Sequence, residues 1–126
     1  VSYAGSNRNV VIPNTVKIIG HSSFIDQNVS SITIPEGVQK IESHAFWATG
    51  LTKINLPESL LIIEETGLAS TNISSILIPK NVSYIGKNAF QNCNSLRTIK
   101  INKEKNSISG SKWGAPNASA TVEWLG

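Results

Sequence analysis

Four prolines mark a repeat that covers most of the chain. Pro13, Pro35, Pro57 and Pro79 stand 22 residues apart, and the residue before each of them is Ile or Leu. A second apolar column lies two residues before that one and keeps steps of 22 or 23 residues through six copies: Val10, Ile32, Ile54, Ile76, Ile99 and Val122. Two columns with the same spacing predict a solenoid, in which each repeat packs only against its neighbours.

Each copy contains an apolar-x-apolar pair, which predicts a short strand with one buried face. The next strand comes one repeat later in the same direction, so the strands pair in parallel and the residues between them form the crossover. Proline has no amide hydrogen and a fixed φ, so we expect it to end each strand and to turn the chain into the next side of the coil. The crossover adds three inward columns: Val16, Val38, Leu60 and Val82; Ile19, Ile41, Ile63 and Ile85; Phe24, Phe46, Leu68 and Phe90. In the fifth copy Asn102 replaces the proline and Lys105 the valine, while Ile108 and Trp113 fill the remaining columns.

The repeat unit has the form L-x-x-I-x-I-P-x-x-V-x-x-I-x-x-x-A-F, best seen in "LTKINLP" (51–57) and "NVSYIGKNAFQNCNSL" (81–96). This unit resembles the BspA-like leucine-rich repeat family of bacterial cell-surface proteins, over about residues 8 to 124. The resemblance implies an α/β repeat: a right-handed leucine-rich-repeat solenoid of about five to six coils, with a parallel concave sheet and short helical or irregular convex segments. It carries over no catalytic residues. The third copy departs from the unit, because it has "TGLAS" (66–70) where the family has Ala-Phe.

We expect the 126 residues to form a single leucine-rich-repeat domain. Residues 1–8 would be an N-terminal edge or cap, 9–113 the repeats, and 114–126 a closing strand. The chain contains no Met, so we take it as a mature or excised segment, and the resemblance implies that the larger protein is anchored or secreted. No stretch of it approaches the roughly 20 apolar residues of a membrane span, so we expect no membrane insertion in this segment.

The sequence offers no catalytic constellation. His21 and His44 follow their prolines by eight and nine residues, so they do not share a column, and no other ligand type joins them. Cys93 is the only cysteine; Thr49 and Thr71 occupy the same column, which favours a small buried filler over a nucleophile. There is no nucleophile elbow, phosphate loop or dinucleotide fingerprint. We therefore predict no enzyme, no cofactor and no metal.

Two pairs of acids recur one repeat apart. Glu36 and Glu58 directly follow prolines, and Glu42 and Glu64 each come seven residues after one. In stacked coils each pair would place like charges about 5 Å apart. The first interpretation is a set of solvated loop residues, since exposed charge pairs interact weakly. The alternative hypothesis is a weak calcium site.

Charge is unevenly distributed along the solenoid axis, although the whole chain carries only +3. Residues 26–65 have a net charge of −4, and residues 80–112 a net charge of +6. Lys100 lies between two inward columns and should project from the concave sheet. The basic end is interpreted either as a solvated surface or as a site for a polyanion or an acidic protein. Trp47 follows an inward Phe and should face outward, where exposed Trp often marks an interface. The candidate partner-binding residues are Lys80, Arg97, Lys100, Lys103, Lys105 and Trp47.

The leading hypothesis is a non-catalytic interaction or adhesion module of a bacterial cell-surface protein. Its partner would be a host or cell-surface protein, or a polyanionic glycan, bound on the concave face or the basic end. We do not expect nucleic acid as a partner, because the basic patch lacks interleaved stacking aromatics. The alternative is a structural spacer that displays another domain and has no ligand of its own.

Overall fold

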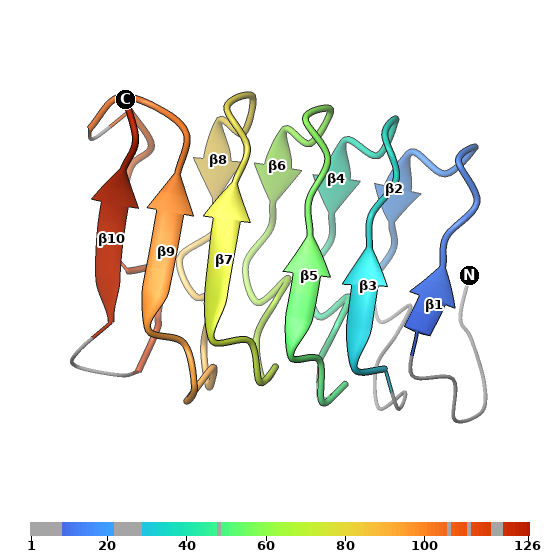
Figure 1. Cartoon of the computed structure of the whole chain (residues 1–126), viewed down its shortest axis with the longest axis horizontal. Coiled ribbons are helices and arrows are strands. Elements are labelled where there is room, and N and C mark those ends of the chain that lie inside the picture. The colour runs from blue at the N-terminus through green and yellow to red at the C-terminus, as the bar shows by residue number, and fades with distance from the viewer. Residues whose placement is uncertain (1–8, 22–28, 48, 106, 111, 117–119) are drawn as a thin grey trace.

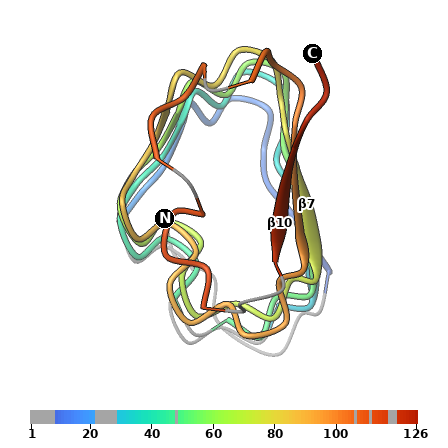
Figure 2. The same cartoon turned by 90° about the vertical axis from the view of Figure 1, so that its left-hand side faces the viewer.

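The chain forms a β-solenoid, seen here in a computed structural model. The structure describes residues 9–21, 29–47, 49–105, 107–110, 112–116 and 120–126. Successive coils stack side by side along one axis (Figure 1). Viewed along that axis, they superimpose as a closed loop whose interior holds the core (Figure 2). The solenoid predicted from the repeat is therefore confirmed.

Strands lie on two opposite faces of the coil. The first set defines what we call the six-strand face: β1 (Asn9–Val11), β3 (Ser31–Thr33), β5 (Lys53–Asn55), β7 (Ser75–Ile78), β9 (Thr98–Ile101) and β10 (Thr121–Trp124). The second set forms the four-strand face: β2 (Ile18–Ile19), β4 (Lys40–Ile41), β6 (Ile62–Ile63) and β8 (Tyr84–Ile85). All recorded strand pairs are parallel. Figure 1 shows the six-strand face in front and the four-strand face behind it.

The strand register follows the sequence columns. Val10 pairs with Ile32 and Ile32 with Ile54, while Ile76 pairs with Ile99 and Ile99 with Val122. Each proline lies just beyond a strand of the six-strand face, as predicted, and its carbonyl accepts a hydrogen bond from the amide three residues later. The proline therefore closes the same tight turn in four successive coils: Val16 N to Pro13 O, Val38 N to Pro35 O, Leu60 N to Pro57 O, and Val82 N to Pro79 O.

The core is a stack of apolar columns running along the solenoid. Most of the described inward residues are almost fully buried, whereas Val16, Leu56, Val122 and Trp124 are half-buried; Ile108 and Trp113 close the fifth copy. Buried members of the predicted columns include Ile32, Ile54, Ile76 and Ile99; Val38, Leu60 and Val82; Ile19, Ile41, Ile63 and Ile85; Phe46, Leu68 and Phe90. Burial at about 25 cal/mol per Å² of apolar surface makes these columns the main source of stability.

The six-strand face is interrupted at its centre. β1, β3 and β5 form one three-stranded sheet, and β7, β9 and β10 form another. β5 and β7 remain neighbours in the stack but do not pair in a ladder (Figure 1). The coils are still joined just before the break, where Asn72 N donates to Leu51 O over 2.7 Å.

Of the expected short helical or irregular segments, the helical alternative is wrong for the residues that the structure describes, which contain no helix. The segments between the two faces consist of single turns, such as Ala45 N to Glu42 O and Gln91 N to Asn88 O. A helix needs several consecutive residues in one conformation and is costly to nucleate. Here the left-handed φ of His44 (58°) and Asn92 (61°) interrupts the run of helical dihedrals, so the chain makes successive separate turns and not a continuous helix. The α/β class is therefore corrected to an all-β solenoid.

The number of coils is also smaller than expected. Four coils carry a strand on both faces, so the solenoid has about four turns rather than five to six. In the fifth copy the described residues after β9 include no strand opposite to it. Lys105 is exposed at the position where the earlier copies bury Val or Leu, so the inward column that anchors the second strand is lost there.

Candidate binding surface

Outward residues of the six-strand face change character along the axis. Thr33 and Asn55 are aligned and polar, and Asn55 Nδ2 donates to Thr33 Oγ1 over 3.3 Å. Leu77 comes next and is 54% exposed. It aligns with Lys100 on β9, which aligns with Glu123 on β10. A large apolar side chain thus lies in the middle of this face, between a polar half and a charged half.

A pocket of about 240 Å³ opens at the break between β5 and β7. Its lining combines apolar side chains, two amides and two carboxylates, and includes no Lys, Arg or His: Glu36, Ile54, Asn55, Leu56, Glu58, Leu77, Pro79 and Asn102. Leu56 is only half-buried, whereas its counterparts Ile34 and Ile78 are fully buried. The break therefore exposes apolar surface that the neighbouring coils keep in the core. We call this cavity the β5–β7 pocket.

The predicted basic residues do not form one patch. Lys80 and Lys103 line a shared hollow of about 470 Å³, but Glu104 lines it as well. Lys103 is half-buried and its Nζ donates to Val82 O over 2.9 Å, so it has a structural role. Lys105 is exposed in the turn after β9, and Arg97 is exposed just before that strand.

The charge of Lys100 is partly compensated. Glu123 lies beside it in register, so this column does not present an uninterrupted positive surface. Glu123 lies outside residues 80–112, so its negative charge is not part of the net +6 of that segment. A role of the six predicted residues in partner binding stays a prediction.

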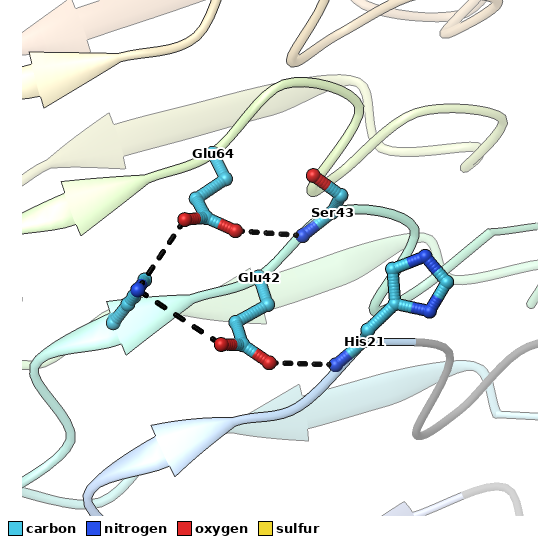
Figure 3. Close-up of polar contacts among 5 residues, drawn as sticks. His21, Glu42, Ser43 and Glu64 are labelled. Carbon is cyan, nitrogen blue, oxygen red and sulfur yellow. Dashed lines mark hydrogen bonds and ion pairs between the residues drawn. The ribbon is translucent and has the colours of Figure 1, made fainter.

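One of the two acidic ladders carries a lysine between its carboxylates. Lys40 Nζ lies 3.3 Å from Glu64 Oε2 and 3.9 Å from Glu42 Oε2. The second oxygen of each carboxylate accepts a backbone N–H from the preceding coil, from His21 to Glu42 and from Ser43 to Glu64 (Figure 3). Each carboxylate thus joins two coils, and Lys40 reduces the repulsion between them.

In the other acidic pair, Glu36 and Glu58, the Glu36 carboxylate accepts hydrogen bonds from the backbone of the next coil. Glu36 Oε2 accepts from Glu58 N over 2.9 Å, and Glu36 Oε1 accepts from Ser59 N over 3.2 Å. The Glu58 side chain is exposed at the rim of the β5–β7 pocket. Within the described residues no group of three or more His, Cys, Asp or Glu side chains could hold a metal ion. The carboxylates of Glu36, Glu42 and Glu64 therefore have partners within the chain, whereas the described part of the structure gives none for the Glu58 carboxylate.

Comparison with known families identifies the repeat. A profile described as the BspA type leucine rich repeat region matches six copies over residues 2–113. The chain belongs to this family. A comparison with curated proteins gives no significant match.

Several solved structures share the solenoid fold. A leucine rich cell surface protein from Faecalibacterium prausnitzii is 36% identical, over 58% of this chain and 20% of its own, with a TM-score of 0.53. The pneumococcal vaccine antigen PcpA has a TM-score of 0.74, with 23% identity over 98% of this chain and 30% of its own. A leucine rich repeat protein from T. pallidum has a TM-score of 0.72, with 21% identity over 98% of this chain and 54% of its own. The chain thus spans between 20% and 54% of these structures.

Cys93 fills the core of this BspA-type repeat. It is buried, and its Sγ lies 3.1 Å from Leu68 O and 3.3 Å from Thr71 Oγ1. Burial raises the pKa of the Cys93 thiol, which keeps it protonated and unreactive near neutral pH. The geometry supports the interpretation of Cys93 as a filler. Leucine-rich-repeat solenoids are generally non-enzymatic, and the absence of catalysis here stays a prediction.

Trp47 lies away from the basic residues, on the second coil. Its side chain is half-buried, and its ring centroid lies 4.8 Å from that of His44. His21 and His44 do not share a sequence column, yet their ring centroids lie 5.5 Å apart. The left-handed φ of His44 (58°) redirects the chain there, so a one-residue offset in sequence does not separate the rings.

Sequence reasoning missed the most distinctive part of the surface. In the sequence Leu77 shares its outward column with Val11, Thr33, Asn55 and Lys100, and a Leu stands out among mostly smaller or polar residues. That contrast was the available signal.

No helix in the described part of the chain is long and apolar enough to cross a bilayer.

Proposed function

We propose that the chain is a non-catalytic interaction module of a bacterial cell-surface protein, and that its six-strand face binds another protein. The observation that carries this proposal is Leu77, 54% exposed at the centre of the face and at the edge of the β5–β7 pocket. Large apolar side chains surrounded by polar ones are typical of protein-binding centres. The similar cell-surface protein of Faecalibacterium prausnitzii supports the location.

The arrangement of charge favours a protein partner over a polyanionic glycan. Lys100 has Glu123 beside it, and two carboxylates line the pocket on the other side of Leu77. A uniform polyanion would meet these three carboxylates at short range, where like charges repel. A protein with both signs of charge can match both halves of the face. Lys80, Arg97 and Lys105 would contribute by steering an acidic part of that partner.

The spacer remains the alternative because the first half of the same face is small and polar. On this face Asn55 Nδ2 donates to Thr33 Oγ1, and in the turn that follows the face Ser59 Oγ donates to Val38 O over 2.7 Å, so these side chains join successive coils. A structural spacer needs only such contacts between its own coils and no exposed site for a partner. The two functions differ in whether Leu77 contacts anything.

A binding screen with matched variants tests the proposal. The chain would be applied to an array of matrix proteins, host-cell proteins, glycosaminoglycans and cell-wall polyanions, at low and at physiological salt. We expect a protein to bind, and we expect Leu77→Glu to abolish that binding. Leu61→Glu is the control, because Leu61 is 40% exposed but lies next to the four-strand face. A hit confined to glycans, or equal loss in both variants, would contradict the proposal; silence across the array would favour the spacer.

A further inference from the structure

Backbone N–H and C=O groups of β5 and β7 point toward the β5–β7 pocket, because no ladder joins these two strands. Asn55 O accepts a hydrogen bond from Ile34 N, so Asn55 directs its backbone groups toward β3. Backbone directions alternate along a strand, so Ile54 and Leu56 direct theirs toward β7. Ile78 O accepts from Asn102 N on the far side, so Leu77 directs its groups back toward β5.

These groups lack the partners that the rest of the sheet provides. Since β5 and β7 do not pair, the N–H and C=O groups of Ile54, Leu56 and Leu77 lie at the break without ladder bonds, and all three residues line the pocket. Backbone polar groups next to apolar surface require partners from water or from a ligand. The pocket therefore offers carbonyl acceptors in addition to its side chains.

The polar side chains that line the β5–β7 pocket favour a positively charged group over a negatively charged one. Glu58 and Glu36 supply carboxylates, Asn55 and Asn102 supply amides, and no basic side chain lines the pocket. Both oxygens of Glu36 already accept backbone N–H groups. In the described part of the chain the recorded ion pairs are those of Lys40, so the exposed carboxylate of Glu58 has no cation of its own there.

The size and shape of the pocket fit one side chain. Its volume of about 240 Å³ is below the roughly 300 to 1,000 Å³ of small-molecule sites. Leu56, Leu77 and Pro79 provide apolar surface for the stem and the flat faces of a guanidinium. A guanidinium has five N–H donors in one plane, which match acceptors around a rim better than the single point charge of an ammonium.

We infer that the β5–β7 pocket receives an arginine side chain of the protein partner. This inference rests on the proposed function, since it names the group that the six-strand face recognises. The guanidinium pairs with Glu58 and donates to the backbone carbonyls exposed by the break, while its stem packs against Leu77.

Short peptides test the pocket without knowledge of the partner. The isotope-labelled chain would be titrated with acetyl-Gly-Arg-Gly-amide, and with the Lys and Glu analogues, while backbone amide NMR signals are followed. We expect saturable shifts of the Ile54, Leu56 and Leu77 amides with the Arg peptide, weaker shifts with the Lys peptide and none with the Glu peptide. Absence of shifts at these amides, or equal shifts with the Glu peptide, would overturn the inference.

A pair of charge reversals completes the test. Glu58→Lys should weaken Arg-peptide binding at least about tenfold, the loss expected for one charge-assisted contact. Glu65→Lys makes the same charge change at an exposed residue outside the pocket and should leave binding unchanged. Thermal unfolding would verify that both variants fold. If a protein partner is lost with Leu77→Glu but binds Glu58→Lys normally, the proposed function stands and the inference fails.

Discussion

At the scale of single residues, side chains that bond from one coil to the next hold the stack together. Cys93 does so in the core, where it reaches Leu68 O and Thr71 of the preceding coil. Glu36 does so at the surface, where one carboxylate accepts two backbone N–H groups of the following coil. Both contacts join residues about one repeat apart, so each stabilises the interface between two coils rather than the coil that contains it.

The raised pKa of Cys93 predicts a pH dependence of stability. The folded chain keeps the thiol protonated at a pH where the unfolded thiol, with its lower pKa, already ionises. Unfolding then releases a proton, so the free energy of unfolding should fall as pH rises above about 8.5, by up to about 1.4 kcal/mol per pH unit. Urea denaturation at about pH 7 and about pH 9.5 would measure this fall.

A threonine variant is the control for the thiol. Thr49 and Thr71 occupy the same column and are buried. Cys93→Thr should therefore fold and lose the thiol-dependent part of the fall, leaving only the contribution of other groups. An identical pH dependence in the two proteins would show that Cys93 is not the cause.

Glu36 should contribute more to stability than its counterpart Glu58. Glu36→Gln removes one of two acceptor oxygens and leaves a backbone N–H with a poorer partner, at a cost of about 1 to 2 kcal/mol. Glu58→Gln changes an exposed side chain and should alter the free energy of unfolding by less than about 0.5 kcal/mol. Chemical denaturation of the two variants would compare them. Equal effects would mean that the Glu36 hydrogen bonds do not stabilise the fold.

At the scale of elements, stability depends on how closely one coil approaches the next. Gly86 follows β8 and donates its amide to Ile63 O over 2.8 Å. A Cβ at Gly86 would lie 2.6 Å from the Cα of Glu65, so the two backbones meet there without room for a side chain. Gly50 differs, since it has a φ of 75° and nothing within 4 Å of its Cβ position.

The two glycines separate coil contact from backbone strain. Gly86→Ala should force neighbouring coils apart and lower the free energy of unfolding by at least about 3 kcal/mol. Gly50→Ala should cost only about 1 to 2 kcal/mol, the strain of a left-handed conformation. Thermal and urea unfolding of both variants would give the comparison. A smaller effect for Gly86→Ala would contradict the close approach of the coils.

The strands and core columns could be predicted because they repeat. Val10, Ile32 and Ile54 share a column in sequence and pair in the structure. The turns between the faces could not be predicted, because the left-handed φ of His44 follows from local packing and not from a glycine. The β5–β7 break could not be predicted from the sequence either, since Ile54 and Ile76 are separated by the same 22 residues as Ile32 and Ile54, whose strands do pair. Periodicity therefore predicts what the coils have in common and misses where they differ.

At the scale of the whole molecule, the two faces of the solenoid have different surfaces. The four-strand face carries an ion-pair network around Lys40 that ties coils together. The six-strand face has the interruption, the pocket and the exposed Leu77. Because coils in a solenoid contact only their neighbours, one face can be specialised without loss of the core. Binding is therefore expected on the six-strand face.

Hydrogen–deuterium exchange of the chain, alone and with a protein captured in the screen, tests this claim most directly. Amides at the centre of the six-strand face lie at an unpaired break, so they should exchange readily in the free chain and slowly in the complex. The account predicts protection concentrated in β5, β7 and β9. Protection confined to β2, β4, β6 and β8 would contradict it and would place the interaction on the opposite face.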